Sequence, residues 1–170
     1  MTWPWLHSFC EWLKSTAISH TIQDTSWIIP ATQTVHILAV ALVFSSALMM
    51  DLRIIGLIDQ RQSIATYLHR FIRPIWSTLP VLFATGVILT IGEPSRELEN
   101  PAFQLKMVLL LLAVVATSLL RRPAIVGSSR WDDISKPTVA MKIIAFASLG
   151  LWTAIIFAGR WIAYANTGSD

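Results

Sequence analysis

The sequence predicts an all-α membrane protein, a four-transmembrane-helix bundle preceded by an amphipathic helix at the membrane interface. Of its 170 residues, 54% are hydrophobic and only 14% are charged, whereas soluble domains are about one quarter charged. Four apolar stretches are each long enough to cross the hydrocarbon layer. Eight tryptophans against two tyrosines indicate aromatic belts at a membrane surface. Length and composition together favour one integral membrane domain over residues 1–170.

The same numbers exclude several other classes of protein. Cys10 is the sole cysteine of the chain, so no internal disulfide and no cysteine-based zinc site can form. The formal net charge is +3, but the lysines and arginines flank apolar segments instead of forming a basic patch. We therefore expect a lipid bilayer as the surrounding medium and no nucleic-acid partner.

The four spans are expected at about residues 27–50, 74–91, 102–120 and 139–164. Each has the length of about 20 apolar residues that ~30 Å of hydrocarbon requires. Pro80 lies inside the second span and removes one backbone donor there, which neighbouring helices can accommodate. The connections at 51–73, 92–101 and 121–138 are too short to hold another domain.

The charges of these connections predict the orientation. Nine of the thirteen cations lie in or beside the first and third connections, and the positive-inside rule makes that side cytoplasmic. The middle connection carries Glu93, Glu97 and Glu99 against Arg96, as expected outside. We therefore expect a multi-pass protein of the bacterial inner membrane with both termini on the periplasmic side. The nine cations are Arg53, Arg61, Arg70, Arg73, Arg121, Arg122, Arg130, Lys136 and Lys142.

An amphipathic interfacial helix is expected at about residues 3–18. Its apolar residues recur at helical spacing and its polar residues share the opposite side, which is typical of a helix lying on a membrane surface. It would serve as a surface anchor or a lid. The apolar residues are Trp5, Leu6, Phe9, Trp12 and Leu13, and the polar residues are His7, Glu11 and Lys14.

His36 is the clearest candidate for a functional residue. An imidazole inside hydrocarbon usually faces a cavity, a partner or a cofactor, although a buried histidine can also be a satisfied core residue. Thr32 and Gln33 precede it by one turn and could orient its ring. His69 lies on the order of 25 Å away in depth, so the two histidines cannot share one site.

Two cations lie close to the outer ends of spans. Lys106 lies about one turn inside the third span and either faces the site or extends to the headgroups. Arg160, followed by Trp161, has the pattern of an interfacial anchor but could also reach the site. Trp152 is expected at a depth close to that of His36.

Several segments resemble a family of uncharacterised bacterial four-helix inner-membrane proteins over nearly the whole chain. They are Trp27 to Pro30, the run beginning at His36, the run Asp51 to Gly56, the run Asn100 to Lys106, and the stretches Ser148 to Trp152 and Gly159 to Tyr164. A His in span one, a Pro early in span two and a Lys opening span three also resemble HemJ-type protoporphyrinogen oxidases. The CopD-like copper-resistance membrane domain has a similar plan. The HemJ-type resemblance implies a haem b bound at His36 and a functional role for Lys106. The amphipathic N-terminus and the Asp51–Arg53 segment depart from that family.

These observations favour a haem-b-binding redox or electron-transfer protein, with a membrane oxidoreductase as the candidate enzyme class. His36 would be the metal ligand, Lys106 and Arg160 would ligate iron or pair with propionates, Gln33 would line the site, and Trp152 would pack against the macrocycle. The partner would be a quinone or another membrane redox subunit. Two alternatives stay open: a small transporter or metal-permeation subunit resembling CopD-like domains, and a structural subunit of a larger membrane complex.

Overall fold

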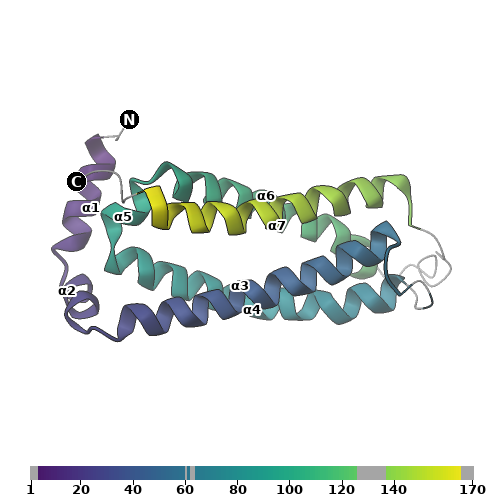
Figure 1. The fold of residues 1–170 in the computed structure, drawn as a ribbon, viewed down its shortest axis with the longest axis horizontal. Coiled ribbons are helices and arrows are strands. Elements are labelled where there is room, and N and C mark those ends of the chain that lie inside the picture. The colour runs from purple at the N-terminus through teal and green to yellow at the C-terminus, as the bar shows by residue number, and fades with distance from the viewer. Residues whose placement is uncertain (1–3, 60, 62–63, 126–136, 166–170) are drawn as a thin grey trace.

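In the computed structural model, every regular element is an α-helix within the described residues, which are 4–59, 61, 64–125 and 137–165 (Figure 1). The helices are α1 (Pro4–Lys14), α2 (Ala17–Asp24), α3 (Ile28–Ile55), α4 (Ile64–Gly92), α5 (Pro94–Leu98), α6 (Pro101–Ile125) and α7 (Val139–Ala165). Four of them, α3, α4, α6 and α7, are long and apolar enough to cross a membrane. The predicted all-α fold with four membrane spans is therefore confirmed.

Three helices extend further than hydropathy predicted, and one of them, α6, continues to Ile125 instead of residue 120. The helix α4 begins at Ile64 instead of residue 74, because Leu68 and Ile72 are buried against the rest of the bundle. The helix α3 continues to Ile55 and ends at Gly56, whose positive φ of 95° suits the left-handed helix cap that glycine favours. Asp51 therefore lies inside α3 and not in a connection.

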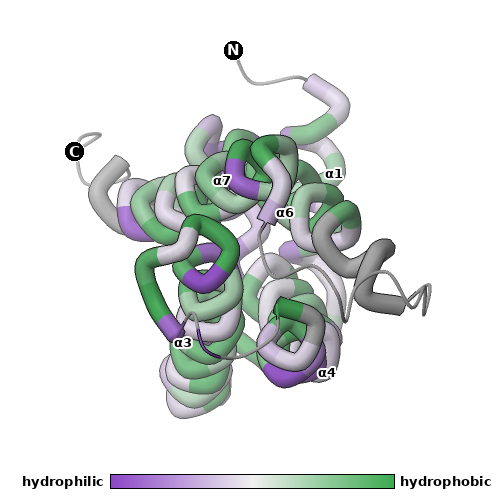
Figure 2. Tube along the Cα trace, turned by 90° about the vertical axis from the view of Figure 1, so that its right-hand side faces the viewer, coloured by the Kyte–Doolittle hydropathy of each residue, from purple (hydrophilic) through white to green (hydrophobic). Residues whose placement is uncertain are grey.

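The four long helices form two antiparallel pairs that share one core. The helix α3 packs along α4, α6 packs along α7, and α3 also packs along α7, whereas α4 and α6 contact each other sparsely. Viewed along the bundle, hydrophobic positions occur over all four helices (Figure 2). The core includes Val43, Ala47, Met50, Ile54, Leu68, Ile75, Ala113, Ala145 and Ile155.

The outside of the bundle is apolar and part of its inside is polar. Leu38, Phe83 and Leu111 are exposed, whereas Thr117 and Ser148 are buried. A soluble monomer rarely exposes apolar patches of this extent. Lipid chains cover such a surface without cost, so the distribution fits a protein surrounded by lipid.

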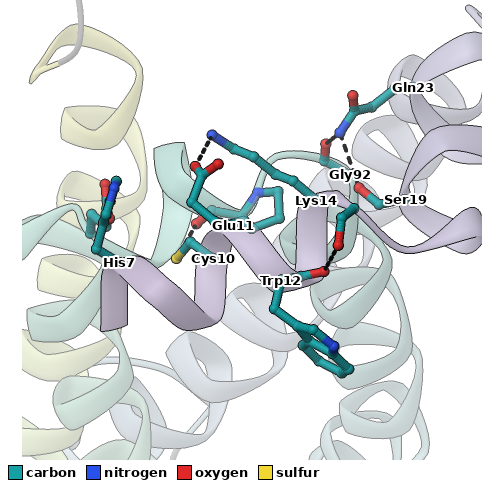
Figure 3. Close-up of polar contacts among 11 residues, drawn as sticks. His7, Cys10, Glu11, Trp12, Lys14, Ser19, Gln23 and Gly92 are labelled. Atoms are coloured by element: carbon teal, nitrogen blue, oxygen red, sulfur yellow. Dashed lines mark hydrogen bonds and ion pairs between the residues drawn. The ribbon is translucent and has the colours of Figure 1, made fainter. Parts of the chain in front are cut away.

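The helices α1 and α2 lie across one end of the bundle, which we call the N-terminal end (Figure 1). Ser19 Oγ donates to the carbonyl of Ile91 at 2.8 Å, and Gln23 Nε2 donates to the carbonyl of Gly92 at 2.8 Å. The last carbonyls of a helix lack partners within it, so these two side chains complete the end of α4. Figure 3 shows the Gln23 bonds to Gly92 and Ser19.

The N-terminal segment predicted as one helix over 3–18 consists of two helices. Thr16 caps α2 by accepting a bond from the backbone of Ser19, and the chain turns there. The amphipathic pattern is visible on α1, where Trp12 points away from the Glu11–Lys14 ion pair (Figure 3). A position at the membrane interface stays a prediction.

Only some of the cations that predict the orientation belong to the described residues. Arg61, Arg70 and Arg73 are exposed, and they belong to the α3–α4 turn and the start of α4, at the end opposite α1 (Figure 1). Arg130 and Lys136 lie outside the described residues. The described cations are consistent with the predicted charge asymmetry but do not determine which side of a membrane they face.

Candidate functional site

The ring of His36 is held by a residue of the neighbouring span. His36 lies on α3 and is half-buried, and its Nδ1 is 2.8 Å from Thr85 Oγ1 on α4. Thr85 Oγ1 is also 2.7 Å from the carbonyl of Val81 and must place its one hydrogen there, since two bare oxygens would repel at that distance. The hydroxyl therefore accepts a hydrogen bond from His36, which assigns the ring hydrogen to Nδ1.

This tautomer leaves the lone pair of His36 on Nε2. Within the described residues Nε2 has no hydrogen-bond partner. A metal-binding histidine usually donates its other ring N–H to an oxygen, which fixes the ring and raises its basicity. Thr85, and not the expected Thr32 or Gln33, is the residue bonded to the ring, because the register of α3 and α4 brings it there.

His36 lines a cavity of about 320 Å³ at the N-terminal end of the bundle. Four of the five residues proposed from sequence border it: Gln33, His36, Lys106 and Arg160. They come from α3, α6 and α7, and α4 and α5 complete the wall. The remaining lining residues are Ile37, Val40, Gly86, Leu89, Arg96, Glu97, Phe103, Ile155, Ile156 and Gly159.

Trp152 is not among the residues that line this cavity. Its side chain is buried in the common core, one turn before Ile155 along α7. We expected Trp152 to pack against a ligand beside His36, but its side chain does not form part of the cavity wall.

Lys106 fits into space left by a glycine. A Cβ added to Gly159 on α7 would lie 3.8 Å from Lys106 Nζ, an ordinary van der Waals distance. The ammonium group therefore lies against the α7 backbone at the cavity, where it borders the same space as His36. Of the two interpretations of Lys106, the one that faces the site agrees with this position.

The acidic member of the cavity wall is Glu97 of α5, which the sequence places in the outer connection between the second and third spans. Burial raises the pKa of Glu97, while the nearby charges of Lys106 and Arg96 oppose that rise. Glu97 reaches the cavity because α5 folds back over the bundle between Gly92 and Pro101. A helix of five residues is too short for hydrophobic periodicity to predict this path of the chain.

A second cavity of about 490 Å³ adjoins the first through Arg96, which lines both. Lys14, Gln23, Ile29 and the stretch 92–96 border it, so it lies where α1 and α2 meet the end of α4. Arg96 is held there by Glu93 at 2.6 Å. The cavity of His36 thus has a polar neighbour toward the N-terminal end.

The donor set at His36 limits the metals that the site could bind. Within the described ranges no group of three or more His, Cys, Asp or Glu side chains is placed to hold a metal ion. A metal held by His36 as its one side-chain ligand would need its other ligands from elsewhere, as a porphyrin supplies them.

Comparison with known proteins identifies the family but no activity. The sequence model of a family of unknown function, DUF6644, matches residues 9–165, which include all the site residues above. Neither a curated protein nor a solved structure matches the chain. These comparisons give no evidence for the expected likeness to HemJ-type or CopD-like proteins. The chain belongs to the DUF6644 family.

Proposed function

We propose that the chain is a haem-b-binding redox protein of the bacterial inner membrane, with His36 as an axial ligand of the iron. The observation that carries the proposal is the hydrogen bond from His36 Nδ1 to Thr85 Oγ1, which leaves Nε2 with its lone pair at a cavity. Haem iron is commonly held by the neutral imidazole of a histidine oriented in this way.

The charges of the cavity wall suit the acidic groups of haem. Arg96, Lys106 and Arg160 contribute three cations and Glu97 one carboxylate. Arg96 is also paired with Glu93, which leaves a formal excess of one positive charge. Haem b carries two propionates, which arginine and lysine can pair with. Lys106 is also a candidate second iron ligand, and Gln33 is a neutral hydrogen-bonding group at the wall.

The proposal requires that the cavity be able to hold a haem. A volume of about 320 Å³ is at the lower end of the range for ligand pockets. Holding a haem would require this cavity to widen, and we propose that α4 and α6, which contact each other sparsely, move apart around the ring. Haem would supply one-electron chemistry there, while the chain supplies ligation, charge pairing and exclusion of water.

The wider role follows from the same proposal. A quinone or another membrane redox subunit would exchange electrons with the haem, and a membrane oxidoreductase is the candidate enzyme class. The three positions that resemble HemJ-type protoporphyrinogen oxidases support this class through His36 and Lys106. We place both termini on the periplasmic side, because Arg61, Arg70 and Arg73 lie at the opposite end of the bundle and nine of the thirteen cations lie in or beside the first and third connections.

The test is the visible spectrum of the protein purified in detergent, normalised to folded protein. We expect a Soret band that is lost in His36→Ala and retained in His69→Ala, a matched control at the exposed start of α4. A colourless, folded wild-type protein would refute the proposal, and so would normal haem content in His36→Ala.

Two substitutions at Lys106 separate its two candidate roles. Arginine keeps the positive charge but is a poor iron ligand. Lys106→Arg should retain haem and its spectrum if the ammonium only pairs with a propionate. If Lys106 ligates iron, Lys106→Arg and Lys106→Ala should change the spectrum equally.

A second candidate function is a small transporter whose polar pathway includes His36 and Lys106. The observation that favours it is the adjoining pair of cavities, which share Arg96 and extend from the N-terminal helices to His36. A colourless preparation that moves an ion across liposomes, with a rate reduced in His36→Ala, would support this function over haem binding.

A further inference from the structure

A second group of polar side chains is buried far from His36. Asp51 on α3 is 0% exposed, Ser148 on α7 is 0% exposed and Thr117 on α6 is 1% exposed. Within the described part of the chain, neither carboxylate oxygen of Asp51 has a hydrogen-bond partner, and the same holds for Ser148 Oγ and Thr117 Oγ1. Polar groups buried in hydrocarbon without partners are costly and usually mark a functional site.

These groups lie in one region of the bundle. Asp51 lies on α3 and Ser148 on α7, and these two helices pack along each other. The Ser148 hydroxyl approaches the Asp51 carboxyl group without meeting hydrogen-bond geometry. Lys106 lies against Gly159, and Thr117 and Ser148 are each eleven residues deeper along the same antiparallel pair of helices. At 1.5 Å per residue, Thr117 and Ser148 are therefore within about one helical turn of the same depth.

The cluster is separate from the His36 cavity. Asp51 is fifteen residues after His36 on the continuous helix α3, which corresponds to about 22 Å. On α7, Trp152 lies between Ser148 and the cavity residue Ile155, and its side chain is buried. Along α3, the cluster lies nearer to the end at Gly56 than to the start at Ile28.

The chemistry of the cluster specifies the class of ligand. The atoms of Asp51, Thr117 and Ser148 that lack a hydrogen-bond partner are all oxygens. Oxygens are the ligands that hard cations prefer. Arg53, two residues along α3, donates no hydrogen bond to Asp51. One carboxylate balances one positive charge, so a divalent ion would leave a net charge in hydrocarbon.

We propose that Asp51, Thr117 and Ser148 form a binding site for a small alkali-metal cation such as sodium. The carboxylate neutralises the ion and can supply two oxygens, and the two hydroxyls supply one oxygen each. The ion enters from the end of the bundle opposite α1, since Asp51 is five residues from the end of α3 at Gly56. The site does not depend on a haem at His36.

The test is thermal unfolding of the detergent-solubilised protein in sodium chloride against choline chloride, at constant ionic strength and pH. Because an ion that binds only the folded state stabilises it by mass action, Tm should be roughly 5 °C higher when sodium is in large excess over its Kd. Asp51→Asn should abolish this dependence, and Ser148→Ala and Thr117→Val should raise the sodium concentration at its midpoint at least tenfold. Ser46→Ala is the matched control, because Ser46 is a buried serine on α3 that already donates to the carbonyl of Leu42.

Each other outcome overturns the proposal. An equal effect of sodium and choline would show a general salt effect, and a sodium effect that persists in Asp51→Asn would place the ion elsewhere. Stabilisation by acid and not by sodium, lost in Asp51→Asn, would make the group a proton site. If Asp51→Asn does not fold, equilibrium binding of radioactive sodium to wild type and Ser148→Ala decides the question. Haem content should be unchanged in Ser148→Ala, so this result is independent of the haem proposal.

Discussion

Replacing Thr85 with valine tests the role of the His36 hydrogen bond directly. Valine has nearly the shape of threonine but no hydroxyl, so His36 Nδ1 loses its acceptor at 2.8 Å. The carbonyl of Val81 loses only the side-chain donor of Thr85 and keeps its place in the α4 backbone ladder. The substitution therefore changes the orientation of one imidazole with little effect on the helix.

The expected magnitude follows from that one bond. An intramolecular hydrogen bond contributes about 0.5–1.5 kcal/mol to stability, and removing the partner of a metal-binding histidine typically weakens metal binding about 10–100-fold. We expect the Kd for haem to rise within that range, which corresponds to about 1.4–2.7 kcal/mol. Thr85→Ser keeps the hydroxyl and should bind haem nearly as well as wild type.

The assay is titration of haem into haem-depleted protein, followed by the Soret absorbance. Thr90→Val is the matched control, because Thr90 is on the same helix and donates to the carbonyl of Gly86 at 2.9 Å without contacting His36. Equal affinities of Thr85→Val and Thr90→Val, with both variants folded, would refute the orienting role of Thr85.

Three further predictions concern the N-terminal end, the cavity wall and the membrane orientation. Ser19→Ala should lower Tm by about 2–4 °C, because the partly buried carbonyl of Ile91 loses a donor worth about 1 kcal/mol. Ser8→Ala removes a bond within exposed α1 and should leave Tm unchanged. Burial raises the pKa of Glu97, so the folded protein holds that proton more tightly than the unfolded chain, and stability is lost as pH rises through the folded pKa. The fall in Tm between pH ~4 and ~7 should therefore be smaller in Glu97→Gln, and an equal fall would contradict the assignment. A reporter inserted within residues 126–136 should give a cytoplasmic signal, and a periplasmic signal would reverse the proposed orientation.

The membrane fold could be predicted from composition and hydropathy because lipid imposes one dominant requirement on a helix. An apolar stretch of about 20 residues satisfies it whatever the neighbouring helices are. The ends of the helices follow another rule. The helix α4 begins at Ile64, since Leu68 and Ile72 continue to pack in the core after hydropathy has fallen near Arg70 and Arg73. Sequence hydropathy reports the span in lipid, whereas packing determines the length of the helix.

The candidate site could be predicted only in part, because depth along a span can be counted but the facing side cannot. His36, Lys106 and Arg160 were placed near one another in depth, and all three line one cavity. Thr85 was missed, since its contact with His36 depends on how α4 is rotated against α3. Glu97 was missed because its position depends on the path of the short helix α5.

Trp152 lies next to the residues that line the cavity. Trp152, Ile155 and Gly159 follow one another at helical spacing along one side of α7, and the latter two line the His36 cavity. Trp152 is therefore on the side of α7 that faces the cavity, about one turn, or ~5 Å, deeper than Ile155. The same side of α7 carries Ser148 one turn before Trp152, so a single helix face borders the His36 cavity near one end and the Asp51 cluster near the other. The buried side chain of Trp152 lies between these two regions on the same face, so the polar groups of the His36 cavity and those of the Asp51 cluster are separated along α7 by an apolar layer.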